Sequence, residues 1–528
     1  MNKTIPLTFI LIAGLIFSCK GPEKVIEKPN VLFVAIDDLN DWTGYLGGHP
    51  QSKTPRLDCF ATEAVYFTNS YCSNPACNPS RTAIMTGYAP HTSGVYSNYQ
   101  DWRVVIPERK AIGEYFRENG YYSAGAGKIF HYHMIDSACW DEYWPSQIKN
   151  MPDEYLPNKP EKQEEVTGLD ETTSGTINMP VFENMYMMFD WAPLDIQDSI
   201  MGDYKSVKWV SEKLSEEHEK PFFLACGIYR PHLPWYVPKK YFDMFPLEDI
   251  QLPEVLENDL DDVGNRVKDI AWRAGNYHRH VTDAGLWKDA VQGYLASIAY
   301  ADAMFGMLME ALENSPYADN TIVIVWSDHG WQLGEKEHWR KFALWENVLR
   351  TNLMIKVPEG IQGFESGVKT GACNRVVSLQ DIYPTLIDLC GLPARDDIDG
   401  NSLVPLLKDP DAEWDHAALS SYDFGEFSVR TEKWRYTLYI DGSEELYDHS
   451  NDQEEWYNLA GKDEYSGVIE MMKAYIPDNP APLIKTDQKL QAHHTPPFAT
   501  KEEYDFWLEN GKSYPELIRK YWNKGQQE

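Results

Sequence analysis

The chain has 528 residues, of which 43% are hydrophobic and 13% aromatic, and this is ample material for a large buried core. Its formal net charge is −33 at pH 7. Nucleic acid is therefore not expected as a partner, because phosphate binding requires a basic surface. The same acidity implies that any site for an anionic substrate must gather its positive charge locally.

The N-terminus has the features of a targeting segment. Lys3 precedes an apolar run over residues 5–17, and Cys19 follows directly. The run is too short to span a membrane as a mature helix. It resembles a bacterial lipoprotein signal, so residues 1–19 are predicted to be a signal peptide with a lipid anchor on Cys19. An ordinary secretory peptide is the alternative. Both place the protein outside the cytosol, in the periplasm or anchored to the outer membrane.

Three short apolar runs predict strands of a parallel sheet. They cover residues 31–36, 221–228 and 321–327. Continuous apolar runs of this length indicate strands buried on both faces. Polar residues follow each run, and sites form at the carboxyl ends of such strands. The sheet edge is therefore the expected place of chemistry.

Asp37 and Asp38 follow the first run, and Asp328 and His329 follow the third. Adjacent carboxylates are costly unless a cation neutralises them. Carboxylate oxygens favour Ca²⁺ or Mg²⁺ over zinc. An acidic strand-to-loop turn would explain Asp37 and Asp38 alone, but recurrence of the pattern favours a metal site.

The most informative stretch covers residues 74–94, N-P-A-C-N-P-S-R-T-A-I-M-T-G-Y-A-P-H-T-S-G. Cys77 lies on a proline-broken loop that leads into a candidate helix at residues 82–85. The positive end of a helix dipole and the guanidinium of Arg81 suit an anion. The pattern C-x-P-S-R-x-x-x-x-T-G closely resembles the signature of the sulfatases, in which the cysteine is oxidised to formylglycine. A free loop cysteine is the alternative.

Further matches follow in the order of that family. They are G-K-x-F-H with Lys128 and His131, P-H-x-P with His232, D-H-G-W at residues 328–331, and Lys341. The chain is identified as a formylglycine-dependent, Cys-type sulfatase over most of residues 30–460. It is most similar to the iduronate-2-sulfatase branch.

The resemblance implies an alkaline-phosphatase-like α/β sandwich. A large mixed, mostly parallel sheet would lie between helices, with a smaller C-terminal antiparallel sheet and helix. Residues 26–400 would form the catalytic domain and residues 401–528 the C-terminal subdomain.

The resemblance also assigns roles to individual residues. The metal ligands would be Asp37, Asp38, Asp328, His329 and modified Cys77, with Ca²⁺ as the expected ion and Mg²⁺ as the alternative. Lys128 and Lys341 would hold the sulfate, although Lys336 and Arg340 compete for the role of Lys341. A maturation enzyme would be required as a partner, because the modification is made after translation.

Sulfate ester cleavage explains why a modified cysteine is needed. A thiolate would form a thiosulfate ester with no easy exit, whereas a hydrated aldehyde offers one hydroxyl to attack sulfur and a second to expel sulfate. We expect Cys77 as the nucleophile, activated by the metal and Arg81. His232 would protonate the leaving oxygen, and His131 would help to deprotonate the second hydroxyl.

The expected substrate is a sulfated saccharide, with the 2-O-sulfate of a uronic acid in glycosaminoglycan-derived oligosaccharides implied by the branch. Trp331 and Arg103 are predicted further substrate contacts. Candidates for a carboxylate pocket are Arg103, Arg230, Arg273 and Arg279. The alternatives are another sulfated sugar, a phosphatase or phosphonate hydrolase of the same superfold, and a non-catalytic glycan-binding lipoprotein.

The other elements are predicted from periodicity. Helices are expected at residues 106–119, 290–314 and 378–389, an insertion over the rim of the site at residues 244–288, and antiparallel strands near residues 428–439 with a turn at 441–442. Apart from Cys19 and Cys77, six cysteines remain, and no pairing is predicted for them.

Overall fold

The computed structural model describes residues 28–131, 134, 136–146, 177–181, 188–365, 367–484 and the single residues 505 and 509. The predicted signal peptide and Cys19 lie outside the described residues. Of the predicted C-terminal subdomain at residues 401–528, residues 485–528 also lie outside, apart from residues 505 and 509.

A nine-stranded sheet organises the larger part of the chain. Its order is β11-β2-β12-β8-β1-β6-β3-β4, with β13 paired to β2. These strands are β1 (Asn30–Ile36), β2 (Val65–Tyr71), β3 (Tyr122–Gly127), β4 (Glu142–Trp144), β6 (Phe222–Ile228), β8 (Thr321–Trp326), β11 (Arg350–Thr351), β12 (Leu353–Lys356) and β13 (Gly371–Ser378). The three predicted strands are β1, β6 and β8, which lie side by side and run parallel. The sheet is mixed because β11 and β12 pair antiparallel to their neighbours.

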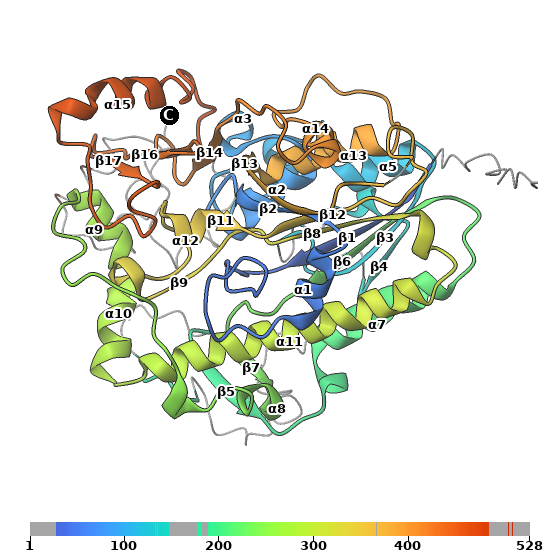
Figure 1. The fold of residues 1–528 in the computed structure, drawn as a ribbon, viewed down its shortest axis with the longest axis horizontal. Coiled ribbons are helices and arrows are strands. Elements are labelled where there is room, and N and C mark those ends of the chain that lie inside the picture. Colours follow the sequence, from blue (N-terminus) through green and yellow to red (C-terminus); the bar gives the residue numbers. More distant parts are fainter. Residues whose placement is uncertain are drawn as a thin grey trace, which may run out of the picture.

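Helices cover both faces of this sheet, as Figure 1 shows. One layer includes α2 (Cys77–Thr86), α5 (Ile112–Glu118) and α13 (Ile382–Leu389), and the other includes α7 (Gly202–Ser215) and α11 (Trp287–Glu313). The alternation of side chains along β1 explains the arrangement. Val31 and Phe33 enter one core, while Leu32 and Val34 enter the other. The predicted sandwich is confirmed.

The helix α11 is 27 residues long and largely apolar. Among the described residues it alone has the length and hydropathy of a membrane span. However, 72% of its most apolar window is buried inside the protein. Its residues Val291, Leu295 and Phe305 belong to the core beneath the sheet.

The C-terminal part forms a second, smaller sheet beside the first (Figure 1). Its antiparallel strands are β14 (Ala418–Ser421), β15 (Phe427–Arg430), β16 (Trp434–Leu438) and β17 (Glu444–Asp448). The helix α15 (Ser466–Lys473) packs Ile469 and Met472 against this sheet. The predicted turn joins β16 to β17, and Gly442 there has a φ of +85°. The domain boundary near residue 400 stays a prediction.

The helix predicted at residues 106–119 is wrong in its first half. The helix α5 starts only at Ile112. Pro107 disfavours the helical conformation for Ile106, whose φ and ψ are −129° and 65°. The segment is then held by tertiary contacts, since Nε of Arg109 donates to the carbonyl of Thr86 at 2.7 Å.

Two further elements extend the sequence prediction. The helix expected at residues 82–85 already starts at Cys77, because Pro79 is tolerated in a first turn. The weakly periodic insertion contains α9 (Asn265–Ala271) and α10 (Arg273–Asp283). All seven cysteines that the structure describes are free thiols.

Candidate active site

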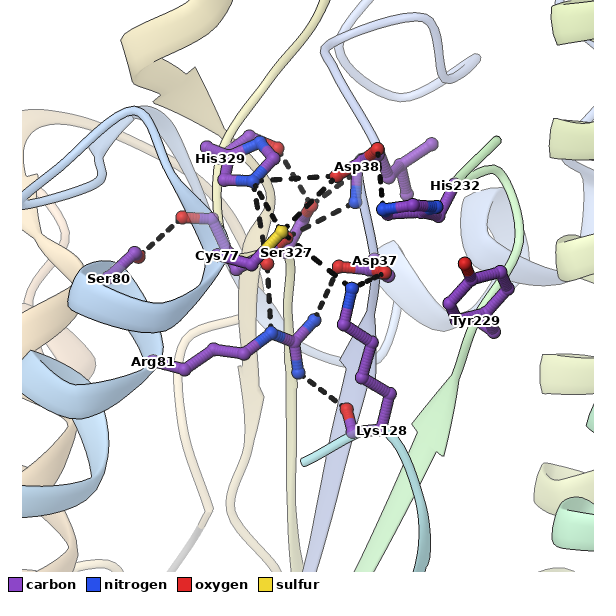
Figure 2. A network of polar contacts seen from close by, with 12 residues as sticks. Asp37, Asp38, Cys77, Ser80, Arg81, Lys128, Tyr229, His232, Ser327 and His329 are labelled. Atoms are coloured by element: carbon purple, nitrogen blue, oxygen red, sulfur yellow. Dashed lines mark hydrogen bonds and ion pairs between the residues drawn. The ribbon is translucent and has the colours of Figure 1, made fainter. Parts of the chain in front are cut away.

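Polar side chains from four neighbouring strand ends meet at one edge of the sheet. Asp37 and Asp38 follow β1, Asp328 follows β8 at a short distance, Lys128 follows β3, and His232 follows β6. These strands are adjacent and parallel, so their carboxyl ends lie together. Figure 2 shows the side chains converging on Cys77. The sequence prediction of a site at this edge agrees with the geometry.

Cys77 is the first residue of α2 and is 1% exposed. Its Sγ lies 2.8 Å from Nζ of Lys341, 3.3 Å from Nε2 of His329 and 3.7 Å from Nζ of Lys128. Burial raises the pKa of the Cys77 thiol to about 12, although both lysines oppose the shift. A neutral thiol is a weak nucleophile, so the unmodified side chain is poorly suited to attack sulfur.

Arg81 lies one turn further along α2 and forms ion pairs with two carboxylates of the site. Its Nη2 is 2.8 Å from Oδ1 of Asp37, and its Nε is 2.8 Å from Oδ2 of Asp328. Lys128 pairs with the other oxygen of Asp37. Burial and Asp328 would raise the pKa of Asp37, but Lys128 and Arg81 outweigh them and hold it below its usual value. Asp37 is therefore an ionised, fully paired carboxylate.

Asp38 has a different environment from its neighbour. Its Oδ1 lies 2.7 Å from Nζ of Lys341, whereas its Oδ2 is buried with no hydrogen-bond partner among the described residues. Burial raises the pKa of Asp38 to about 7, and Lys341 opposes this only in part. A buried oxygen without a donor is an acceptor available to a cation.

The backbone of Asp38 is held in an uncommon conformation, with a φ of 58°. Its N–H donates to Oδ1 of Asp328 at 3.1 Å, and the hydroxyl of Tyr294 donates to its carbonyl at 2.8 Å. Tyr294 could not be recognised from the sequence, because it lies among the apolar positions of α11 and no motif marks it.

The orientation of the His329 ring is that expected of a ligand to a cation. Its Nδ1 is 3.0 Å from the carbonyl of Gly330 and therefore carries the proton. Burial lowers the pKa of His329 to about 4, so the ring is neutral. The lone pair of Nε2 then faces Oδ1 of Asp38 at 3.4 Å and Oδ2 of Asp328 at 3.5 Å. A lone pair beside two carboxylate oxygens is repulsive unless a cation lies between them.

The donor atoms of Asp38, Cys77, Asp328 and His329 all lie within 4.8 Å of one another. Together with the unpartnered oxygen of Asp38, this set fits a divalent cation. An oxygen ligand at position 77 would suit Ca²⁺ better than sulfur does. Asp37 is the fifth predicted ligand. Its carboxylate lies within 4.8 Å of the donor atoms of Asp38 and His232. It already pairs with Arg81 and Lys128.

Two of the predicted proton carriers are buried histidines. His131 is 7% exposed and His232 is 4% exposed. Burial, followed by the charges of Lys128 and Lys341, lowers both pKa values well below the usual range. Nδ1 of His232 lies 2.6 Å from the carbonyl of Leu233, and its Nε2 lies 3.8 Å from Oδ2 of Asp38.

The structure distinguishes Lys341 from its two competitors. Lys341 contacts both Cys77 and Asp38. Lys336 instead lies 2.6 Å from Oδ1 of Asp259, and Nη1 of Arg340 lies 3.2 Å from the hydroxyl of Tyr277. Sequence spacing alone could not separate three cations within six positions.

Of the two further predicted substrate contacts, Trp331 lies beside Lys341, whereas Arg103 is not brought to the cluster. Arg103 pairs with Asp136 and lies 3.4 Å from Glu114, and its described contacts do not include the cluster residues. Trp331 is 1% exposed and stacks with Tyr294. Its ring supports Lys341, whose Nζ lies 5.6 Å from the ring centroid. Trp331 therefore packs beside the predicted sulfate-binding lysine, and its contact with a sugar stays a prediction.

Residues 29–392 match the sequence model of the Sulfatase family. The chain belongs to the sulfatase family. Residues 334–480 also match a model described as N-sulphoglucosamine sulphohydrolase, C-terminal. The family implies a metal ion and a formylglycine made from the signature cysteine.

Curated relatives agree with this assignment. A sulfatase of Formosa agariphila is 36% identical over 89% of this chain and 91% of its own. Human iduronate 2-sulfatase is 28% identical, with 69% of each chain covered.

Solved structures bear on the fold. A structure described as a 2-O GAG sulfatase has a TM-score of 0.63 and 20% identity, and the match covers 85% of this chain and 91% of the other. A phosphonate monoester hydrolase from Silicibacter pomeroyi has a TM-score of 0.66 and 19% identity, with 85% and 94% covered. The alkaline-phosphatase-like fold of this sulfatase is thus shared with both kinds of hydrolase.

Proposed function

We propose that this sulfatase hydrolyses the 2-O-sulfate of a uronic acid in glycosaminoglycan-derived oligosaccharides. The observation that carries the proposal is the surrounding of Cys77, where two lysines and a candidate cation site converge on one buried atom. Positioning and neutralisation of charge are what sulfuryl transfer demands. The similarity to iduronate 2-sulfatase supports the choice of a uronic acid.

The substrate sulfate would be held by Lys128 and Lys341, whose Nζ atoms lie 3.7 Å and 2.8 Å from Sγ of Cys77. Arg81 keeps Asp37 and Asp328 ionised and in place. A divalent cation, Ca²⁺ by preference, would be held by Asp38, Asp328, His329 and residue 77. When bound, it supplies Lewis-acid polarisation and charge neutralisation.

Position 77 would carry formylglycine, whose hydrated aldehyde supplies the hydroxyl nucleophile. His232 is suited to protonate the leaving oxygen through Nε2, since Nδ1 already donates to the carbonyl of Leu233. Burial and the lysines lower its pKa, and the negative charge of a bound sulfate ester opposes this shift. His131 would accept the proton of the second hydroxyl.

Two measurements test the proposal. Mass spectrometry of the peptide that contains Cys77, from protein made in a host with a sulfatase-maturating enzyme, should detect the aldehyde. The enzyme should then hydrolyse a 2-O-sulfated uronide disaccharide at least about tenfold faster than 4-O- or 6-O-sulfated amino sugars. An aldehyde with a clear preference for an amino sugar would keep the sulfatase chemistry and exclude the uronide.

Structural similarity to phosphonate monoester hydrolases makes one alternative concrete. The same matured protein should be assayed with an aryl sulfate and an aryl phosphonate monoester. We expect the sulfate to be the better substrate. Phosphonate turnover far above sulfate turnover would favour the alternative.

We also propose that the protein is exported and anchored through a lipid on Cys19. The basic start, the apolar run over residues 5–17 and the cysteine support this. Cys19→Ala should release the protein from membranes into the soluble fraction. Continued membrane association of that variant would contradict the anchor.

A further inference from the structure

A second cationic residue lies beside the predicted sulfate-binding lysine. Arg273 is the first residue of α10, and its guanidinium carbon is 4.2 Å from the ring centroid of Phe342. Nζ of Lys341 is 5.9 Å from the same centroid. The two cations therefore lie within about 10 Å of each other, by the sum of these distances. One pyranose ring with substituents on opposite sides bridges such a separation.

The backbone around Lys341 fixes this arrangement. Arg340 and Phe342 both have positive φ, at 81° and 76°. Such conformations are uncommon for residues other than glycine and persist where the surrounding structure enforces them. The N–H of Phe342 donates to the carbonyl of Pro75 at 3.1 Å, which joins this loop to the loop that precedes Cys77. The ring of Phe342 is thus held in a fixed position close to both Lys341 and Arg273.

Arg273 has a neutral partner where a buried guanidinium usually has an acid. It is 8% exposed, and its Nη1 lies 2.6 Å from the hydroxyl of Tyr422. In the part of the chain that the structure describes, it forms no ion pair with a carboxylate. Asp423, the next residue after Tyr422, is engaged by Arg266 at 3.0 Å. Asp423 also lies close enough to Arg273 for their charges to interact, but it makes no direct ion pair with it. A nearly buried guanidinium whose direct partner is neutral favours a ligand that brings a negative charge.

The other three candidate arginines have different environments. Arg103 already pairs with Asp136 and Glu114. Arg230 also forms no ion pair with a carboxylate among the described residues, and its guanidinium carbon lies 5.2 Å from the ring centroid of Tyr229, which Lys128 also approaches. However, Arg230 is only 1% exposed, against 8% for Arg273, so it is less accessible to a ligand. Arg279 is exposed on α10. Of the four, Arg273 is the one placed beside Phe342 and Lys341.

We propose that Arg273, positioned by Tyr422, binds a carboxylate of the substrate and so selects a sulfated uronide over a neutral sulfated sugar. The inference rests on the proposed function. Tyr422 lies in the loop between β14 and β15, so the small C-terminal sheet contributes to substrate choice. A charge-assisted hydrogen bond of this kind is worth roughly 10- to 100-fold in kcat/KM.

The test compares a 2-O-sulfated uronide disaccharide with its carboxyl-reduced counterpart. For Arg273→Gln, we expect kcat/KM on the carboxylated substrate to fall 10- to 100-fold, mainly through KM, and on the reduced substrate by less than about threefold. Arg279→Gln, on the same helix, is the matched control and should leave both values unchanged. Equal losses on both substrates, or no change in their ratio, would overturn the proposal.

Tyr422→Phe separates positioning from direct contact. It removes the hydroxyl that accepts from Arg273 while the ring remains, so a several-fold rise in KM for the carboxylated substrate alone is expected. If KM for the two substrates responds equally, Tyr422 has no positioning role.

An assay with an aryl sulfate distinguishes an error in the proposed carboxylate subsite from an error in the proposed substrate. If the wild-type enzyme hydrolyses an aryl sulfate but neither disaccharide, the proposed substrate is wrong. The subsite is then judged by competitive inhibition of aryl sulfate turnover by glucuronate. Inhibition that Arg273→Gln weakens tenfold or more supports it, and absence of inhibition, or inhibition that the variant leaves unchanged, overturns it.

Discussion

Two clusters of buried charge in this sulfatase look alike but differ in how their acids are satisfied. The active-site cluster groups Asp38, Cys77, Asp328 and His329 closely enough to share an ion. A second cluster, of Glu346, His449 and Glu455, meets the same distance limit. It lies between α12 (Glu346–Leu349) and the C-terminal sheet.

In the second cluster every acid has cationic partners. Arg435 pairs with both Glu346 and Glu455, and Nε2 of His449 is 2.9 Å from Oε1 of Glu455. In the active site, Asp38 retains a buried oxygen without a donor. Proximity of acids and a histidine is therefore a poor guide to a metal site, whereas incomplete pairing is a better one. The first cluster is suited to catalysis, and the second joins two parts of the fold.

The largest expected effect is a loss of sulfatase activity when the active-site cluster is changed. Cys77→Ala should lower sulfatase activity by at least about 10⁴-fold, because the nucleophile is lost. Cys59→Ala, at an exposed cysteine, is the matched control and should retain full activity. Initial rates on an aryl sulfate measure both variants. Substantial turnover by Cys77→Ala would remove the cysteine from the mechanism.

The second cluster should respond in stability instead. Arg435→Met leaves Glu346 and Glu455 buried with less neutralisation, so the free energy of unfolding should fall by about 3 to 5 kcal/mol. Lys356→Met breaks an exposed pair with Glu63 and should cost less than about 1 kcal/mol. Urea denaturation followed by tryptophan fluorescence measures both. Equal effects would show that the buried network is no more important than a surface pair.

The two clusters should also differ in whether they contribute to stabilisation by a metal ion. Ca²⁺ at 100 times its Kd should stabilise the chelator-treated wild type by about 2.7 kcal/mol against unfolding. Asp38→Asn should abolish this gain, because the unpartnered carboxylate oxygen is lost. Glu346→Gln should keep the gain, although the protein starts from a lower stability. Calorimetry with and without Ca²⁺ is the measurement, and a gain lost equally in both variants would refute the distinction.

The smallest predicted effect concerns pH. Burial would raise the pKa of Glu346, but Arg430, His449 and Arg435 together hold it well below its usual value of 4.5. A depressed pKa contributes stability that is present above pH 4.5 and is lost as the pH falls further. The Tm of Glu346→Gln should therefore approach that of the wild type as the pH is lowered from about 5 to 3. A constant difference in Tm across this range would contradict the assignment.

The sequence predicted the sheet and the cluster well for a physical reason. Each apolar strand ends in a polar residue, and parallel strands bring such ends together whatever lies between them. Asp38, Cys77, Asp328 and Lys341 could therefore be found from motifs and strand ends.

Side chains whose role depends on tertiary contact could not be found in this way. Tyr294 occupies an apolar stripe, and its hydroxyl matters only because Asp38 lies beside it. The contact between Arg273 and Tyr422 joins residues 149 positions apart. Arg103 was predicted to bind substrate because it is basic, yet nearby acids engage it. Periodicity also cannot show that the segment before Ile112 is held by a hydrogen bond from Arg109 to the carbonyl of Thr86.

The burial of Cys77 bears on whether its modification comes before or after folding. All ten residues of α2 are buried, and the side chain of Asn74 donates to the carbonyl of Tyr422 at 3.1 Å, which closes the small sheet over the loop before the helix. Once the two sheets are packed together, the thiol of Cys77 is too deeply buried to enter the active site of another enzyme. Any oxidation of Cys77 by a maturation enzyme must therefore happen while the polypeptide is still open. A chain that folded before such a modification would keep residue 77 as a buried thiol, which is a weak nucleophile.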